Sequence, residues 1–109
     1  MKFNPMGGSN MNQMMKQAKK MQEEMAKTQA ELQERIIEGS AGGGAVMVKV
    51  NGKQRVLEIK IKPEVVDPED VEMLEDLIMA AINDAIKQSQ DMVSTEMAKI
   101  TGGLNIPGL

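Results

Sequence analysis

The stretch that decides the fold is residues 45–62, AVMVKVNGKQRVLEIKIK. Apolar residues alternate with polar ones on both sides of Asn51-Gly52, a pattern typical of two β-strands joined by a two-residue turn. A turn of that length pairs Val46 with Leu57 and places one set of apolar side chains on a single face. This set consists of Val46, Val48, Val50, Leu57, Ile59 and Ile61. The sequence therefore predicts an antiparallel hairpin with one face against a core.

The hairpin needs support, because two isolated strands are marginally stable in water. Residues Ile36 to Ala41 can add a short third strand. Four glycines lie in the run Gly39-Ser40-Ala41-Gly42-Gly43-Gly44 between this segment and the hairpin. A phosphate-binding loop would require a following Gly-Lys-Ser/Thr and a helix, and neither follows the run. We interpret the glycine run as a tight irregular strand entry or a bulge.

A long helix is predicted before the sheet, from about Ser9 to Glu38, because this segment contains no glycine or proline. Ser9 or Asn10 can cap its N-terminus. Apolar residues recur at alternating spacings of three and four, which is the seam of a helix laid along another helix. The seam consists of Met11, Met14, Ala18, Met21, Met25, Thr28 and Leu32. The alternative is a plain amphipathic helix on its own core.

A second long helix is predicted after the sheet. Asp67-Pro68-Glu69-Asp70 is a helix start, with Asp67 as the cap and Pro68 at the first helical position. A wide apolar stripe follows, formed by Val71, Leu74, Leu77, Ile78, Ala81, Ile82, Ala85 and Ile86. Beyond Lys87 the stripe thins, so we expect that half to project from the core. Gly102-Gly103 is expected to end the helix.

These elements together predict an α+β fold: a long N-terminal helix, a small antiparallel sheet and a long C-terminal helix. A chain of 109 residues has room for one domain. We expect a flexible leader at residues 1–8, a single α-β-α domain at residues 9–101, and a flexible tail at residues 102–109.

The composition favours a homodimer. The chain has one aromatic residue, Phe3, and twelve methionines. Long helices on a small aromatic-free core leave apolar faces exposed, and a second copy of the chain can cover them. The residues expected to form the core or the dimer contact are Val46, Val48, Val50, Leu57, Ile59, Leu74, Ile78, Ala81, Ile82 and Ala85.

The composition also argues against catalysis. The sequence has no histidine and no cysteine, which removes the usual general base, the commonest metal ligand and the thiolate nucleophile. Carboxylate pairs such as Glu23-Glu24 fall on helix surfaces, where solubility explains them. We expect no enzyme activity, catalytic residue, metal, cofactor or small-molecule substrate. No apolar run is long enough to span a membrane, so we expect a cytoplasmic protein with no membrane partner.

The sequence resembles the YbaB/EbfC family of nucleoid-associated proteins. The matching stretches are Gly39-Ser40-Ala41-Gly42-Gly43-Gly44, Val48-Lys49-Val50-Asn51-Gly52, residues 67–78 (DPEDVEMLEDLI), residues 80–85 (AAINDA) and Thr101-Gly102-Gly103-Leu104. The resemblance implies a small bacterial homodimer whose helices form tweezer-like arms on a joined β-sheet. It also implies DNA as the partner, broad or weak sequence preference, and a role in nucleoid organisation and gene regulation. The sequence has no aromatic platform for single-stranded nucleic acid, which favours double-stranded DNA.

The charge distribution suggests where DNA would bind. The net charge is −3, but residues 39–62 carry five basic residues and one acidic residue, whereas residues 63–109 carry ten acidic and two basic ones. Lys16, Lys19 and Lys20 share one helix face, and Lys27 follows two turns on. These four are the candidate DNA-binding residues. The alternative is that they only solvate the outer face of the seam. A second basic group consists of Lys49, Lys53, Arg55, Lys60 and Lys62.

Two functions follow from these observations. The first is a homodimer that binds duplex DNA through phosphate contacts, with low sequence specificity, and that alters its conformation in the nucleoid. The second is a protein-interaction adaptor, because methionine-rich helical arms suit adaptable protein contacts. Failure to shift DNA at low salt would favour the adaptor.

Overall fold

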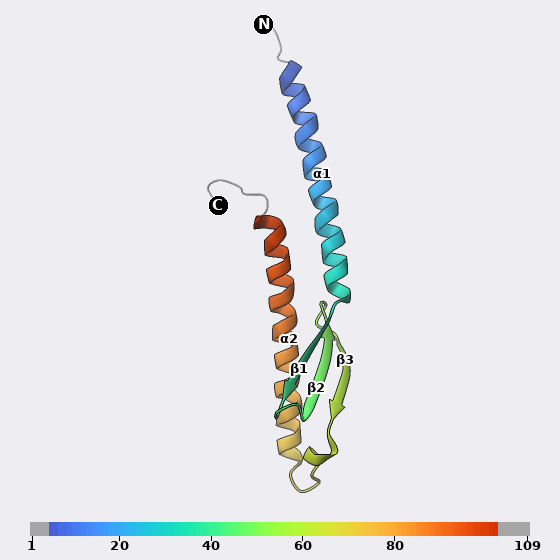
Figure 1. The fold of residues 1–109 in the computed structure, drawn as a ribbon, viewed down its shortest axis with the longest axis vertical. Coiled ribbons are helices and arrows are strands. Elements are labelled where there is room, and N and C mark those ends of the chain that lie inside the picture. Colours follow the sequence, from blue (N-terminus) through green and yellow to red (C-terminus); the bar gives the residue numbers. More distant parts are fainter. Residues whose placement is uncertain (1–4, 103–109) are drawn as a thin grey trace.

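The computed structural model describes residues 5–102, which form an elongated α+β domain measuring 87 × 25 × 16 Å (Figure 1). The elements, in chain order, are helix α1 (Pro5–Glu34), strands β1 (Ile36–Ala41), β2 (Val46–Asn51) and β3 (Val56–Ile61), a 3₁₀ turn η1 (Pro63–Val65) and helix α2 (Val71–Gly102). The predicted fold class is confirmed, and so is the short third strand. Helix α2 runs along the sheet, and α1 leaves the sheet as an arm that extends past the end of α2 (Figure 1).

The three strands form an antiparallel sheet in the order β1-β2-β3. The predicted register of the hairpin was wrong, because Val46 pairs with Ile61 and Val48 with Ile59. The two residues of the expected turn became a longer loop, and a bulge lies between Lys49 and Val50. The register moved by four residues, an even number, so Ile59 and Ile61 still share a face with Val46 and Val48.

The side chain of Asn51 explains the longer loop. Its Oδ1 accepts hydrogen bonds from the backbone N–H groups of Lys53 (2.9 Å) and Arg55 (3.1 Å). Gln54 adopts a left-handed backbone conformation with φ of 61°. An asparagine that bonds to nearby backbone offers the chain an alternative to the tight two-residue turn. We call residues Gly52 to Arg55 the hairpin loop.

The core lies between α2 and the face of β1 and β2 that it covers. Val46, Val48, Val50, Ala81 and Ala85 are completely buried. Three other residues expected in the core, Leu74, Ile78 and Ile82, are half-buried and pack against this cluster. The two remaining ones, Leu57 and Ile59, lie on β3, which α2 does not cover, and their side chains are exposed in the single chain.

The close approach of α2 to the sheet depends on Gly39 of β1. A Cβ atom at this position would lie 2.6 Å from Ala85 Cα and 2.7 Å from Ala85 Cβ. Gly42, Gly43 and Gly44 form the turn between β1 and β2 with positive φ angles. Gly39 therefore serves a helix contact, and Gly42 to Gly44 form a tight turn that leads into β2, which is the strand entry that we expected; the pairing of β1 with β2 has no bulge.

The predicted ends of the first helix were wrong. It ends at Glu34, not Glu38, because residues 36–41 pair with β2 and this tertiary pairing overrides local helix propensity. It begins at Pro5, so the expected caps Ser9 and Asn10 lie inside it. Part of the expected leader, residues 1–8, is thus helical. Residues 1–4 of that leader and residues 103–109 of the expected tail lie outside the described residues.

The second helix also starts later than expected, at Val71. Asp67 accepts a hydrogen bond from the Glu69 N–H (2.9 Å) within a separate turn. Asp70 caps the helix, because its Oδ1 accepts a hydrogen bond from the N–H of Met73 (3.2 Å), the third helical residue. The motif does precede the helix, but both assignments within it were wrong: Asp70 and not Asp67 is the cap, and Pro68 lies before the first helical position.

Candidate nucleic-acid interface

The four candidate lysines lie on α1, the arm. A helix of 30 residues is about 45 Å long at a rise of about 1.5 Å per residue. Lys16, Lys19, Lys20 and Lys27 are all exposed. Lys16 and Lys20 are one turn apart, and Lys27 lies eleven residues from Lys16, which returns to the same side of the helix. The arrangement expected from the sequence is thus present, and we call these four residues the lysine face.

The lysine face lies opposite the methionine seam on the same helix, about half a turn away. At the sheet end of the seam, Leu32 is buried and Met25 is half-buried. At its outer end, Met11 and Met14 are 64% and 65% exposed. Because the seam and the lysines point in opposite directions, a polyanion on the lysine face would not compete with protein contacts made by the seam.

Charge is distributed unevenly along the arm. From Pro5 to Gln22 it contains three lysines and no acidic residue. From Glu23 to Glu34 it contains four glutamates, at positions 23, 24, 31 and 34, and a single lysine, Lys27. Glu23 and Glu31 lie one turn on either side of Lys27 and weaken its local positive potential. The outer half of the arm is therefore the part with the strongest attraction for phosphate.

The second basic group lies on the sheet and the hairpin loop, away from the outer half of the arm. Lys49 and Lys60 belong to the sheet face opposite α2, where Lys49 pairs with Glu58 (Nζ to Oε2, 3.7 Å). Lys53 and Arg55 lie in the hairpin loop, and Lys62 follows β3. Acidic Glu38 and Glu58 belong to the same sheet face as Lys49 and Lys60, so this surface has mixed charge.

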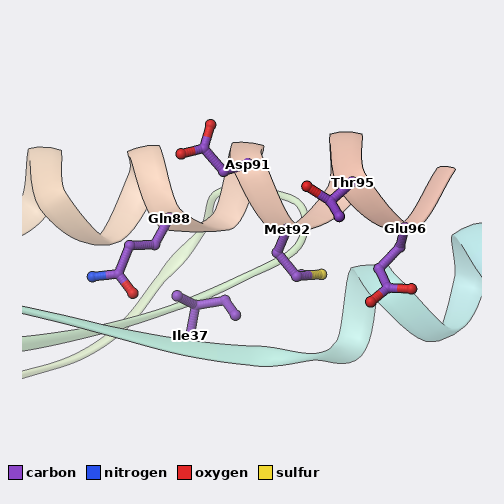
Figure 2. A pocket seen from close by; sticks show the side chains of 6 residues that line it. All are labelled: Ile37, Gln88, Asp91, Met92, Thr95 and Glu96. Carbon is purple, nitrogen blue, oxygen red and sulfur yellow. The ribbon is translucent and has the colours of Figure 1, made fainter. Parts of the chain in front are cut away.

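An open cleft of 360 Å³ lies between β1 and the flank of α2 that faces it. Figure 2 shows that its lining side chains come from both elements: Ile37, Gln88, Asp91, Met92, Thr95 and Glu96. Glu96 also bonds to Arg35 (3.5 Å) and Lys99 (3.3 Å), which ties the end of α1 to α2. The two carboxylates make the cleft unfavourable for phosphate. Among residues 5–102, no group of His, Cys, Asp or Glu is arranged to hold a metal.

An apolar surface remains uncovered beside α2. On β3, Leu57, Ile59 and Ile61 are 51%, 42% and 36% exposed. Asp84, Gln88 and Asp91 occupy the flank of α2 toward β1, so the opposite flank lies toward β3. This second flank carries Met79, Ile82 and Ile86. We call these six apolar residues of β3 and α2 the apolar trough.

The sequence did not reveal the hydrogen bonds that hold the hairpin loop against α2. Ser89 on α2 is completely buried, and its Oγ donates a hydrogen bond to the Asn51 carbonyl oxygen (2.8 Å). Gln54 Nε2 donates to Ser89 Oγ (3.3 Å) and to the Gly52 carbonyl oxygen (3.1 Å). The only available sequence signal was a polar Ser89 within a mostly apolar helix face. That signal is too common to identify this contact between α2 and the hairpin loop.

Comparisons with known proteins identify the family of the chain. The model of the YbaB/EbfC DNA-binding family matches residues 6–104. The chain belongs to this family. Among its YbaB/EbfC relatives, a protein named nucleoid-associated protein from Alkaliphilus metalliredigens is 66% identical over 108 residues, covering 98% of this chain and 95% of the relative. A protein of the same name from Pelotomaculum thermopropionicum is 57% identical over 104 residues, covering 95% and 99%.

The YbaB/EbfC fold is also found among solved structures. The crystal structure of the uncharacterized protein HP0035 from Helicobacter pylori aligns with a TM-score of 0.66. The alignment covers 93% of this chain and 98% of that chain at 23% sequence identity, so it supports the fold alone. No helix within residues 5–102 is long and apolar enough to cross a membrane.

Proposed function

We propose that this YbaB/EbfC protein binds duplex DNA as a homodimer, with the lysine face of each arm against the phosphates. The observation that carries the proposal is the acid-free outer half of the arm with its three exposed lysines, in a chain that belongs to a DNA-binding family. The relatives named nucleoid-associated proteins support a place in the nucleoid, where the protein is proposed to contribute to DNA organisation and gene regulation.

Low sequence specificity follows from the chemistry of the lysine face. Lysine ammonium groups contact phosphate oxygens, which are the same at every base pair and carry no sequence information. The sequence has no tyrosine or tryptophan and a single phenylalanine, so it lacks the aromatic surfaces on which single-stranded bases stack. Duplex is therefore the favoured ligand.

The acidic end of the molecule supports this orientation. Residues 63–76, which connect the sheet to α2 and begin that helix, carry seven acidic residues and no basic one. They lie at the end of the domain opposite the outer half of the arm (Figure 1). Repulsion from phosphates would keep this end away from DNA, and attraction to the lysines would favour contact through the arm.

The apolar trough supports the homodimer. Exposed apolar surface of this kind is typical of a protein contact site, and the trough continues the core of the single chain at its edge. The outer edge of β1 is partly blocked, because the N–H of Ser40 donates a hydrogen bond to Asp84 Oδ2 (3.0 Å). That leaves the side of the sheet at β3, with its apolar residues, for the second copy.

Fluorescence anisotropy with two unrelated labelled duplexes at low salt tests the proposal. We expect similar affinity for both duplexes and a large loss of affinity in the triple variant Lys16→Ala, Lys19→Ala, Lys20→Ala. The matched control removes the same charge from the sheet side, with Lys53→Ala, Lys60→Ala and Lys62→Ala. An equal loss in both variants would mean that net charge, and not the lysine face, governs binding.

The adaptor function keeps one observation in its favour. Met11, Met14 and Met15 are 64–67% exposed on the outer half of the arm. Flexible, polarizable methionine side chains are suited to adaptable protein contacts. A protein partner recovered equally well before and after nuclease treatment, together with no duplex binding at low salt, would support the adaptor over the DNA-binding function.

A further inference from the structure

The arm leaves the sheet without a linker. Arg35 is the single residue between α1 and β1, and its N–H donates a hydrogen bond to the Leu32 carbonyl oxygen (3.1 Å). This bond tightens the last turn of the helix. Residues 11–20 of the arm are exposed, so the direction of the arm is set by contacts nearer the sheet, among them the Arg35–Glu96 ion pair and the burial of Leu32.

One of these contacts is a close backbone approach by Gly52, the first residue of the hairpin loop. A Cβ atom at position 52 would overlap the carbonyl oxygen of Leu32, and it would lie 2.6 Å from the Leu32 carbonyl carbon and 3.0 Å from Gln33 Cα. All three are backbone atoms of α1, which cannot move aside as the end of a flexible side chain can. The backbone of Gly52 therefore lies directly against the backbone of the arm.

The hairpin loop is held more firmly than the arm. Asn51 Oδ1 accepts two backbone N–H groups of the loop, and the Gln54 N–H donates to the Asn51 carbonyl oxygen (2.9 Å). Ser89 connects the same loop to α2 through Asn51 and Gln54. A crowded contact at position 52 would thus be relieved mainly by a tilt of α1.

We infer that Gly52 is a positioning residue: it lets the hairpin loop act as a stop against the last turn of α1, and so fixes where the lysine face is held. This inference rests on the proposed DNA-binding function. The arm amplifies a small change at its base. A shift of about 1 Å at Leu32, pivoting at Arg35, would move Lys20 by about 5 Å and Lys16 by about 6 Å, given about 1.5 Å of helix rise per residue.

The test measures arm position and DNA binding separately. The sequence has no native cysteine, so spin labels can be attached at Gln13→Cys on α1 and Gln90→Cys on α2, both exposed positions. Labelled chains are mixed with excess unlabelled protein, and pulsed dipolar spectroscopy gives the distance within one chain, without DNA. Duplex affinity is measured by anisotropy with unlabelled protein.

In Gly52→Ala we expect the distance between the labels to change by several ångströms and duplex binding to weaken by about tenfold, as lysines leave their phosphates. Gly43→Ala is the matched control, because its positive φ makes alanine strained while nothing lies within 4 Å of the new methyl group. We expect that control to lose stability without changing the distance or the affinity.

Three results would overturn the inference. In the first, folded Gly52→Ala keeps the wild-type distance. In the second, its distance changes but its duplex affinity does not. In the third, Gly52→Ala does not fold and Ser89→Ala, which releases the loop from α2, leaves the width of the distance distribution unchanged. A wild-type protein that does not bind duplex DNA refutes the proposed function instead. The distances measured without DNA still show whether Gly52 sets the position of the arm.

Discussion

Substitution of Ile59 by glutamate tests the apolar trough. Ile59 lies on β3 opposite Val48, and 42% of it is exposed in the single chain. Burying a whole isoleucine side chain stabilises by about 1.5–3 kcal/mol, so covering the exposed part contributes about 1 kcal/mol per copy. Two copies contribute about 2 kcal/mol, and an unpaired carboxylate in the contact costs more on top.

Ile59→Glu should therefore weaken the dimer by at least about 3 kcal/mol, which is more than a hundredfold in the dissociation constant. The single chain can tolerate the change better, because the carboxylate can reach solvent beside α2. Sedimentation equilibrium over a range of protein concentrations measures the dissociation constant, and circular dichroism reports whether the helices remain.

The matched control is Ile36→Glu. Ile36 is 58% exposed and belongs to the sheet face opposite α2, so this variant adds the same charge outside the trough. We expect its dissociation constant to stay near that of the wild type. If Ile59→Glu remained a dimer of wild-type affinity, the trough would not be the contact between copies.

Three other predictions concern stability and the lysine face. Gly39→Ala should lower the unfolding free energy by about 3 kcal/mol, the upper end for overpacking, because its methyl group would meet the backbone of Ala85. Urea unfolding would measure this loss. A loss smaller than that of Gly43→Ala would contradict the prediction. Asp70→Ala should lower the unfolding free energy by about 1 kcal/mol and Asp67→Ala by less, because Asp70 is the helix cap. The reverse order in the same assay would indicate that Asp67 is the cap. Lys27→Ala should weaken duplex binding less than Lys20→Ala, because Glu23 and Glu31 flank Lys27. Anisotropy at low salt compares the affinities of the two variants. Equal losses would show that these glutamates do not reduce the contribution of Lys27 to binding.

Much of the fold could be predicted from the sequence, because several local patterns agreed. Alternating valines predicted β2, and the glycine- and proline-free segment predicted a long helix. The register of β3 could not be predicted, because the pattern fixes only which face a side chain occupies. A shift of four residues leaves that face unchanged, and the hydrogen bonds of Asn51 decide between the two registers.

The end of α1 was missed for a related reason. Residues 35–38 contain no helix breaker, and only their pairing with β2 makes residues 36–41 a strand. The lysine face was visible because helical spacing alone brings Lys16, Lys19 and Lys20 together. The close approach of Gly52 to α1 could not be predicted, because it depends on a contact between the hairpin loop and Leu32, twenty residues earlier in the chain.

The most direct test of the central claim is the salt dependence of duplex binding, compared between the wild type and the variant with Lys16, Lys19 and Lys20 replaced by alanine. Each phosphate contact contributes about 0.9 to the slope of log K against log salt. If both arms of a dimer use all three lysines, the substitution should reduce the slope by about 5. A variant that keeps the wild-type slope and affinity would show that the arm does not hold the DNA.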